Sequence, residues 1–411
     1  MVPSDSHPRQ SDLRRLSRRR LLALACTAAA GGLAGCNAVT GREDPADLHA
    51  GDWHACGNGP ENGNRVSGGA PEPTEHAPLY PADWSYAPPV VDGEIVYFAA
   101  EREAVAIGFD GRERWSRRLG GEAFGAPALD PDRGRLYVPT RGGEQGGSPS
   151  DGADAASVVA LSVDGGDAID THRVGDGATY GVTVVDGDVY ARSATACVRL
   201  GPDGTERWRV SLEPLVYDEY NLGDSTATQI PPAVTEDGVY VPDRDALVKL
   251  DRESGEERWR APVDTPYAAS VVDDRGVVQT GWRETIAVDR AGEERWRRDL
   301  HSRAAAAVDG DDVYVVAGDL YELDAESGEP NWHAHVPSEG TAAPVVTDDS
   351  VVVAGSGVRA FRRDAEGVLS PERLRWRTDS VHVTAYASPV IAAGRLLAVG
   401  PFGLQVLDTG D

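Results

Sequence analysis

The sequence predicts an all-β protein, an eight-bladed β-propeller whose ring is closed by a strand from the N-terminal side. Three observations favour this fold: a hairpin pattern that recurs eight times, a turn-plus-Trp pattern between the hairpins, and an unfinished last copy at the C-terminus. The 411 residues include 47 Gly and 27 Pro spread among short Val-rich runs, which suits short strands joined by many turns. Outside the N-terminus, no long stretch has helical periodicity.

The first recurring pattern is a β-hairpin of the type APVVxDGxVYV. Each copy has two β-rich runs joined by Asp and Gly, residues that tolerate the positive φ of a tight turn. The copies lie at residues 87–99, 126–139, 180–192, 231–242, 268–280, 305–317, 342–354 and 387–399. The repeat length, near 36–38 residues between Trp259, Trp296 and Trp332, holds four short strands. Eight such units predict a propeller, in which each blade covers the apolar face of its neighbour.

The second recurring pattern is a turn that starts at Asp and leads to Trp. Its copies run from Asp110 to Trp115, Asp203 to Trp208, Asp251 to Trp259, Asp289 to Trp296, Asp324 to Trp332 and Asp364 to Trp376. In the second repeat, Asp170 stands where Trp is expected. Each Trp is predicted to fill the gap between two blades, because the adjoining Gly turn lets the backbone approach the ring.

The last copy, VLDTGD, ends before its Trp. Trp84 precedes the first hairpin, as each other repeat Trp precedes the next hairpin. The sequence therefore predicts that Trp84 belongs to the outer strand of the last blade and that the propeller spans residues 76–411. A blade made from both ends of the chain leaves no free sheet edge.

The N-terminus predicts an export signal, residues 1–35. Arginines precede an apolar run of about fifteen residues, which is too short to span a bilayer comfortably. The stretch SRRRLL, with Arg18 and Arg19, resembles a twin-arginine motif, and LAGC, ending at Cys36, resembles a lipobox. By that resemblance Cys36 becomes the first mature residue and carries a lipid. A plain signal peptide with an incidental Cys is the alternative.

These signals imply a location and a domain organisation. A lipid anchor would hold the folded part outside the cell, on the membrane surface, without a transmembrane helix in the mature chain. Residues 36–75 are expected to form a polar tether and a segment that leads into the propeller.

The composition argues against a nucleic-acid partner. The chain has 40 basic and 67 acidic residues, a net charge of −27, and Lys249 is its one lysine. There is no basic patch to meet phosphates. Abundant Asp and Glu with almost no Lys resembles the surfaces of proteins from halophilic archaea, in which salt screens the mutual repulsion.

The four cysteines have different expected fates. Cys26 leaves with the signal and Cys36 is the lipidation candidate, so Cys56 and Cys197 remain. These two could pair in an oxidising compartment or remain as buried thiols, and their spacing has no metal signature.

The full form of the turn-plus-Trp pattern is D-x-x-[ST]-G-x-x-x-W, which Asp251–Trp259 and Asp324–Trp332 match. It is similar to the Trp-docking motif of pyrrolo-quinoline quinone (PQQ) repeat propellers, and the resemblance covers residues 84–411. Residues 52–68 also resemble the segment that leads into the propeller in this family. The family has two branches: quinoprotein alcohol dehydrogenases, and non-enzymatic lipoproteins such as the bacterial outer-membrane assembly scaffold. The motif therefore implies the fold and leaves the activity open.

The dehydrogenase branch would imply PQQ and Ca²⁺. Such a site needs carboxylate and amide oxygens around the ion, an Asp base and, in the family, usually a vicinal Cys pair. No adjacent cysteines occur, and the chain is short for that branch. We therefore expect no catalytic residue, cofactor or metal, with the quinoprotein as the alternative.

Three local patterns could bind metal, and each has a simpler interpretation. Asp218, Glu219, Asn221 and Asp224 could hold Ca²⁺, but their spacing follows no known calcium loop and favours a solvated acidic loop. Residues 130–135, DPDRGR, favour a hairpin turn. His333 and His335 are expected on one face of a strand, where a transition metal would still lack a third ligand.

Function is expected on the loops, since long loops on a rigid scaffold commonly carry binding. Insertions at 141–157, 213–230 and 364–375 interrupt the repeats, and Tyr217, Asp218, Glu219 and Tyr220 are the candidate contact loop. The sequence thus predicts a scaffold that binds other proteins at the membrane surface. The alternatives are the quinoprotein dehydrogenase and a surface binder of a small ligand or sugar.

Overall fold

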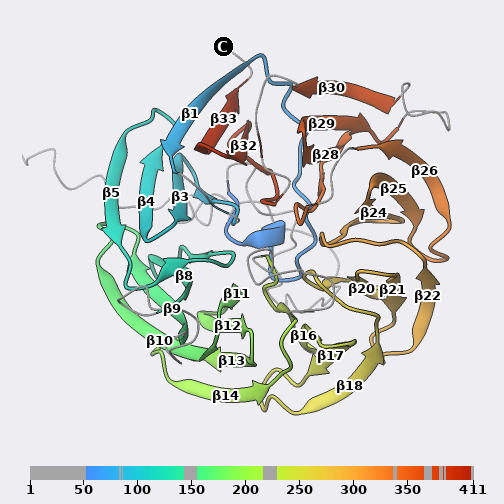
Figure 1. The fold of residues 1–411 in the computed structure, drawn as a ribbon, viewed down its shortest axis with the longest axis horizontal. Coiled ribbons are helices and arrows are strands. Elements are labelled where there is room, and N and C mark those ends of the chain that lie inside the picture. The colour runs from blue at the N-terminus through green and yellow to red at the C-terminus, as the bar shows by residue number, and fades with distance from the viewer. Residues whose placement is uncertain are drawn as a thin grey trace, which may run out of the picture. The chain divides into compact units, whose positions relative to one another are not determined.

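The computed structural model describes residues 52–82, 85, 87–142, 155–215, 229–336, 340–364, 373–378, 383 and 386–408. These residues belong to one compact unit, Glu43–Asp411. They form eight antiparallel sheets arranged around a common axis (Figure 1). The predicted fold, an all-β propeller of eight blades, is confirmed, and each predicted hairpin forms the two inner strands of one blade.

Seven blades are built from strands that follow one another along the chain. Counted from the axis outward, these strands are β2 (Val90–Asp92), β3 (Ile95–Ala100), β4 (Glu103–Gly108) and β5 (Glu113–Arg118) in blade 1; β7 (Ala128–Asp130), β8 (Arg135–Arg141), β9 (Ala155–Ser162) and β10 (Ala168–Asp176) in blade 2, where β6 (Glu122–Ala123) also pairs with β8; β11 (Thr179–Val185), β12 (Asp188–Ser193), β13 (Ala196–Leu200) and β14 (Glu206–Ser211) in blade 3; β15 (Ala233–Thr235), β16 (Gly238–Asp243), β17 (Ala246–Leu250) and β18 (Glu257–Pro262) in blade 4; β19 (Val271–Asp273), β20 (Gly276–Thr280), β21 (Thr285–Val288) and β22 (Glu294–Arg298) in blade 5; β23 (Ala307–Asp309), β24 (Asp312–Ala317), β25 (Asp319–Asp324) and β26 (Pro330–His335) in blade 6; and β27 (Val345–Val346), β28 (Ser350–Gly355), β29 (Gly357–Arg362) and β30 (Leu374–Thr378) in blade 7.

Blade 8 is assembled from both ends of the described chain. Its strands β31 (Val390–Ala392), β32 (Arg395–Gly400) and β33 (Gly403–Asp408) are completed by β1 (Glu75–Pro81), which runs antiparallel to β33. The register pairs Glu75 with Asp408 and Pro81 with Gly403. The prediction that an N-terminal strand closes the ring is therefore confirmed.

The closing strand differs from the prediction in one respect, since it does not include Trp84. Strand β1 ends at Pro81, and Trp84 lies outside the described residues. Ala77 pairs with Val406, just as Trp115 pairs with Ala106 in blade 1. Ala77 therefore takes the register position of a repeat Trp. Strand pairing needs backbone groups and one buried face, both of which β1 supplies without an indole.

The core consists of apolar layers between neighbouring blades. The middle strands are buried on both faces, as in β16, where all six residues are buried. The outer strands bury fewer positions, as in β5, where Trp115 is the buried residue. Tyr240 and Leu247 of blade 4 share one apolar cluster with Ile286 of blade 5. A four-stranded sheet therefore covers both faces only because it has a neighbour on each side.

The described residues include no helix that is long and apolar enough to cross a membrane.

Ring closure makes a prediction for two positions of β1. Leu79 is 7% exposed and shares an apolar cluster with Leu404, whereas His76 is exposed. Leu79→Ala should lower the free energy of unfolding by about 2–4 kcal/mol, because it removes buried methyl groups. It should also speed hydrogen exchange of the β33 amides. His76→Ala is the matched control and should change stability by less than about 0.5 kcal/mol. Equal exchange rates in the two variants would contradict closure through β1.

Candidate functional site

Four tryptophans of outer strands dock on the next blade in the same way. Each indole Nε1 donates a hydrogen bond to a backbone carbonyl of that blade, at 2.7–3.0 Å: Trp115 to Val163, Trp208 to Arg252, Trp259 to Arg290 and Trp296 to Ala325. Each ring lies directly on a glycine of the same turn: Gly166, Gly255, Gly292 and Gly328. These glycines have φ between +70° and +88°, and an added Cβ would lie 2.5–2.9 Å from an indole carbon. Glycine is therefore required at these positions for two reasons: the backbone has a positive φ, and the indole ring leaves no room for a Cβ.

The remaining positions of the motif depart from this pattern. Trp332 and Trp376 are buried, but neither Nε1 has a hydrogen-bond partner within the described ranges. The Arg373 guanidinium lies 4.9 Å from the Trp332 ring centre. In blade 2, Asp170 pairs with Ala160, at the Trp register.

Polar side chains replace the indole between blades 2 and 3. An added Cβ at Gly204 would lie 2.4 Å from the imidazole of His172, so this ring takes the place of an indole on the glycine. Arg135 donates to the Pro202 carbonyl at 2.8 Å, which satisfies an acceptor of the turn. Because imidazole is smaller than indole, a pocket of about 70 Å³ remains beside it.

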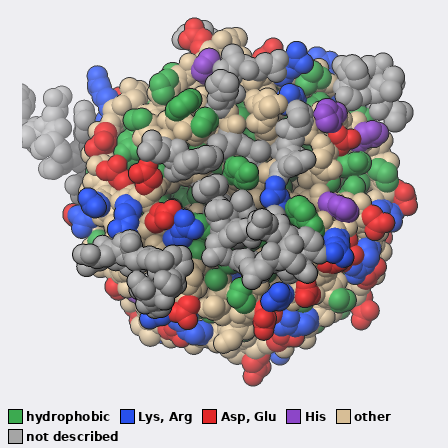
Figure 2. All heavy atoms as spheres, viewed as in Figure 1, with side chains coloured by type: hydrophobic (Ala, Val, Ile, Leu, Met, Phe, Trp, Pro, Cys, Tyr) green, Lys and Arg blue, Asp and Glu red, His purple; other side chains and the backbone are tan. Residues whose placement is uncertain are grey.

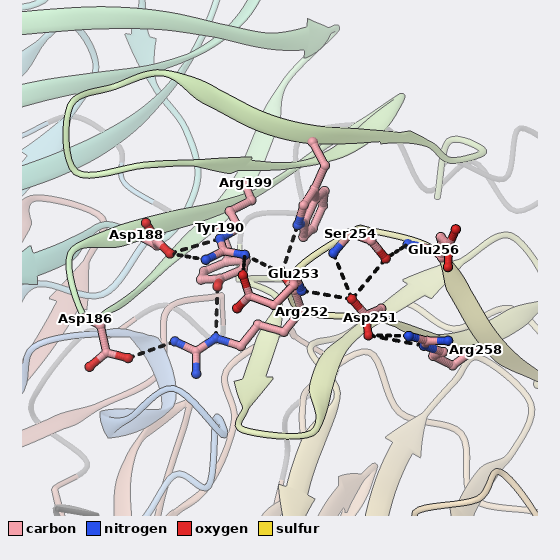
Figure 3. A network of polar contacts seen from close by, with 11 residues as sticks. Asp186, Asp188, Tyr190, Arg199, Asp251, Arg252, Glu253, Ser254, Glu256 and Arg258 are labelled. Atoms are coloured by element: carbon pink, nitrogen blue, oxygen red, sulfur yellow. Dashed lines mark hydrogen bonds and ion pairs between the residues drawn. The ribbon is translucent and has the colours of Figure 1, made fainter.

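The Asp of the motif holds the glycine turn in shape. Asp251 accepts hydrogen bonds from the Ser254 backbone and hydroxyl at 2.8 and 3.0 Å, and from Arg258 at 2.6 Å (Figure 3). Bonds from Arg258 and Ser254 keep the pKa of the Asp251 carboxyl well below its usual range. Asp324 and Ser327 repeat this arrangement in blade 6. The D-x-x-S-G sequence is thus a self-capped turn that presents its carbonyl and its glycine to the Trp.

Arginines from the same turns link neighbouring blades. We call the arrangement a latch when one Arg contacts a Tyr hydroxyl and an Asp carboxylate of the preceding blade. Arg252 of blade 4 donates to the Tyr190 hydroxyl at 3.1 Å and to Asp186 at 2.9 Å, both in blade 3 (Figure 3). Two further latches have the same form: Arg290 with Tyr240 and Asp237, and Arg363 with Tyr314 and Asp309. Acidic and basic side chains are interspersed around the ring (Figure 2).

Asp237 shows the electrostatic effect of a latch. Partial burial alone would raise its pKa, but hydrogen bonds from Lys249 and Thr235 and the charge of Arg290 lower it to about 2. The single lysine of the chain lies 2.8 Å from this carboxylate. Part of the acidic excess is therefore neutralised at blade interfaces.

One end of the axis is closed by the segment 52–70, which we call the plug. It crosses the centre of the ring and contains the short 3₁₀ turn η2 (Cys56–Asn58) (Figure 1). Its backbone bonds to the innermost strands of six blades, through Val91, Leu129, Val234, Val272, Val308 and Val346, at 2.7–3.1 Å. The inner strands thus pair with the chain itself at this end.

Asparagines let the plug follow its tight path. Asn58, Asn62 and Asn64 have φ between +53° and +59°, a conformation that Asn tolerates better than most residues. Asn62 Nδ2 donates to the carbonyls of Pro231 and Ser270 at 3.2 and 3.1 Å. The Oδ1 atoms of the three asparagines have no hydrogen-bond partner among the described residues, an arrangement that ordered water commonly satisfies.

Gln229 crosses the axis at the opposite ends of the inner strands. It precedes blade 4, yet its Oε1 accepts from the backbone and hydroxyl of Ser388 at 2.9 and 2.8 Å. Its Nε2 donates to the carbonyls of Thr341 and Tyr386, which precede blades 7 and 8. Gln229 is 6% exposed, and both polar atoms of its side chain are hydrogen-bonded. The axis is therefore occupied by this chain at both ends.

Several predicted site residues lie outside the described residues. These are Arg18, Arg19, Cys36, Trp84 and the contact loop Tyr217–Tyr220. The contact loop lies within residues 216–228, between the buried residues Leu215 and Gln229.

The other sequence candidates have structural roles. Residues 130–135 form the turn between β7 and β8, where Asp130 bonds to Arg133. His333 stacks on Tyr321 and His335 bonds to Asp319 at 2.9 Å, so each histidine has its own partner. Cys56 and Cys197 are both free and buried, and burial raises the pKa of each thiol to about 12.

Sequence reasoning missed the plug, Gln229 and the position of Ala77. The run GNGPENGN, with its Asn and Gly residues, was the available signal for tight backbone turns. Nothing local identified Gln229, since its partners lie more than 100 residues away.

The family model described as "Outer membrane protein assembly factor BamB" matches residues 58–169, 185–291 and 282–409. The chain belongs to this family. No curated protein matches the chain.

Solved structures with the same fold include members of both branches. BamB from Moraxella catarrhalis has a TM-score of 0.62 and 15% identity, covering 82% of this chain and 97% of that chain. Quinohemoprotein alcohol dehydrogenase from Comamonas testosteroni has a TM-score of 0.63 and 12% identity, covering 88% and 81%. A europium-containing methanol dehydrogenase has a TM-score of 0.61 and 12% identity, covering 86% and 88%. At these identities the likeness establishes the fold alone.

The docking of Trp on glycine predicts unequal effects of two Gly→Ala changes. Gly328 and Gly310 have φ of +71° and +58°, but only at Gly328 would a Cβ meet another atom, Cδ2 of Trp296 at 2.5 Å. Gly310→Ala should cost about 1 kcal/mol for backbone strain. Gly328→Ala should cost about 1–3 kcal/mol more, because the ring must move. Denaturant unfolding measures both. Equal losses would contradict the docking geometry.

The plug makes a prediction about charge. In Asn62→Asp, a buried carboxylate would face two carbonyl oxygens, which should lower the free energy of unfolding by on the order of 3 kcal/mol at neutral pH. Burial should raise the folded-state pKa of the new carboxyl above its unfolded value of about 3.9. The loss should therefore shrink as pH falls through the raised pKa. Asn331→Asp on exposed β26 is the control and should be nearly neutral. A loss in Asn62→Asp that does not depend on pH would contradict this placement.

Proposed function

We propose that this protein is an extracytoplasmic, lipid-anchored propeller that binds other proteins and acts as an assembly scaffold at the membrane surface. The observation that carries the proposal is the occupied axis. With the plug at one end and Gln229 at the other, the chain uses for its own folding the place where a propeller could hold a small ligand. Recognition is then left to the loops and faces of the ring.

The membership of the BamB family supports a scaffold role. The anchor rests on the sequence: Arg18 and Arg19 would direct export, and Cys36 would carry the lipid. Since a single lipid chain gives reversible binding, stable attachment would need further acyl chains or a membrane partner. The acidic surface would suit a salt-rich medium, in which repulsion is screened.

The dehydrogenase alternative has less support from the described residues around the axis. The groups that Asn62 and Gln229 contact there are neutral, coming from Pro231, Ser270, Thr341, Tyr386 and Ser388. The buried asparagine oxygens of the plug are neutral as well. A quinone–calcium centre needs carboxylates, so these residues do not fit that group.

Replacing the candidate contact loop tests the proposal. The full chain would be expressed in its native host and captured from detergent-solubilised membranes, and co-purifying proteins would be quantified by mass spectrometry. Exchange of residues 216–228 for a Gly-Ser linker of equal length should reduce at least one partner tenfold or more, because it removes Tyr217 and Tyr220. Leu215 and Gln229 are kept, since both are buried anchors of the fold.

Two controls accompany this experiment. The same exchange at residues 143–154, another insertion, should leave that partner bound. Cys36→Ser should move the chain from the membrane to the soluble fraction without loss of folding. Partners that are retained equally by all variants would count against the contact loop. Saturable binding of PQQ with Ca²⁺, together with dye-linked alcohol oxidation, would overturn the scaffold proposal.

A further inference from the structure

We propose that Asp52, His54 and Asp92 bind a divalent transition-metal ion that fastens the plug to blade 1. One ligand atom of each residue lies within 4.8 Å of the others. Asp52 and His54 belong to the plug, and Asp92 ends the innermost strand of blade 1. The site is separate from the proposed scaffold surface and stands independently of it.

The backbone holds the three side chains in place. Trp53 and Val91 exchange two hydrogen bonds of 2.8 Å, which form an antiparallel bridge. Side chains alternate along an extended segment, so Asp52 and His54 project to the side opposite the buried Trp53. In this antiparallel register, Asp52 lies across from Asp92. Asp52 also accepts a hydrogen bond from the Gly93 amide at 2.9 Å, which fixes its carboxylate against the hairpin turn.

Two carboxylates that face each other across a strand pair repel. Elsewhere in the ring, acidic side chains at blade interfaces pair with arginine, as Asp186 does with Arg252. Within the described ranges, neither Asp52 nor Asp92 has an arginine partner, and Asp92 has the His54 ring instead. A bound cation would remove the repulsion between the two carboxylates.

The His54 ring places its Nε2 atom beside these carboxylates. Its backbone carbonyl accepts from Leu129 at 2.7 Å, so the residue is also held by blade 2. Its Nε2 atom is shielded from solvent and lies 3.5 Å from Asp92 Oδ1, too far for a strong hydrogen bond. Among the described residues, this nitrogen has no other hydrogen-bond partner. A shielded imidazole nitrogen beside two carboxylates is a donor set for metal.

The donor types indicate the class of ion. One imidazole nitrogen with carboxylate oxygens suits Zn²⁺ and related transition ions, while Ca²⁺ and Mg²⁺ prefer oxygen ligands alone. Asp92 is 44% exposed, so the ion can reach the site and water can complete its coordination. Because the ligands come from two segments that are separate in the sequence and meet only in the folded chain, binding would stabilise the folded state.

Zn²⁺ titration of the full chain tests the proposal. The protein would be purified without a His tag, treated with EDTA and dialysed, and then studied by calorimetry and thermal unfolding. We expect one tight Zn²⁺ equivalent per chain and a rise in Tm that EDTA reverses. His54→Gln should weaken this binding at least tenfold and abolish the rise in Tm. His335→Gln removes another histidine paired with an Asp, at 2.9 Å, and should leave both unchanged.

Asp92→Asn separates metal binding from folding. Removal of one of two facing carboxylates should leave the metal-free Tm equal or higher, yet the Zn²⁺ response should disappear. The proposal is overturned if the wild-type chain binds no Zn²⁺, or if His54→Gln retains the response. It is also overturned if Ca²⁺ at the same concentration raises Tm as much as Zn²⁺, since that would be a general effect on an acidic surface.

Discussion

The pairing of β1 with β33 is the contact on which the ring depends. Each blade buries both faces only against its two neighbours, so an open row of eight sheets would leave two apolar faces in water. Closure by backbone pairing removes that penalty for blades 1 and 8 together. The closing strand follows directly after the plug in the chain, so the segment that bonds to six inner strands also delivers the strand that seals the circle. One stretch, residues 52–81, therefore both occupies the axis and completes the outer strand of the last blade.

Repetition sets the blade interfaces, and its exceptions show which parts of the motif are essential. The glycine turn is kept where the indole is lost, since Gly204 retains φ of +76° and carries the His172 ring instead of a Trp. In blade 1, the neighbour of the closing blade, Gly111 keeps φ of +73° although nothing lies within 4 Å of an added Cβ. The turn thus serves the hairpin of its own blade first, and the docked ring adds stability between blades. A blade can lose its Trp when polar side chains or a strand from the other end of the chain hold the interface.

The sequence predicted the repeated parts of the fold and missed the parts that occur once. Asp-Gly turns and alternating apolar residues are local signals, so all eight hairpins could be located from the chain alone. Ala77 occupies the last Trp position because strand pairing there depends on backbone groups. Such pairing cannot be recognised from the side chains in the sequence. The plug and Gln229 bond to carbonyls of distant blades, and every residue of those blades, proline included, carries a similar acceptor. The Asn-rich run 52–68 was therefore predicted to lead into the propeller, but its bonds to six blades were not predicted.

The occupied axis changes the way in which this fold can recognise a partner. In an open ring, inner-strand backbone groups and axial side chains can meet a ligand, whereas here the plug takes the amides of Val234, Val272 and Val308. The side-chain amide of Gln229 bonds through its nitrogen and its oxygen to residues that precede blades 7 and 8. What remains for the proposed binding is the faces and the rim of a rigid ring. Stiffness favours protein recognition, since loops held by a rigid frame lose less conformational entropy when a partner orders them. A filled axis is therefore consistent with the proposed protein-binding surface, because the chain uses its centre for a rigid support instead of a ligand cavity.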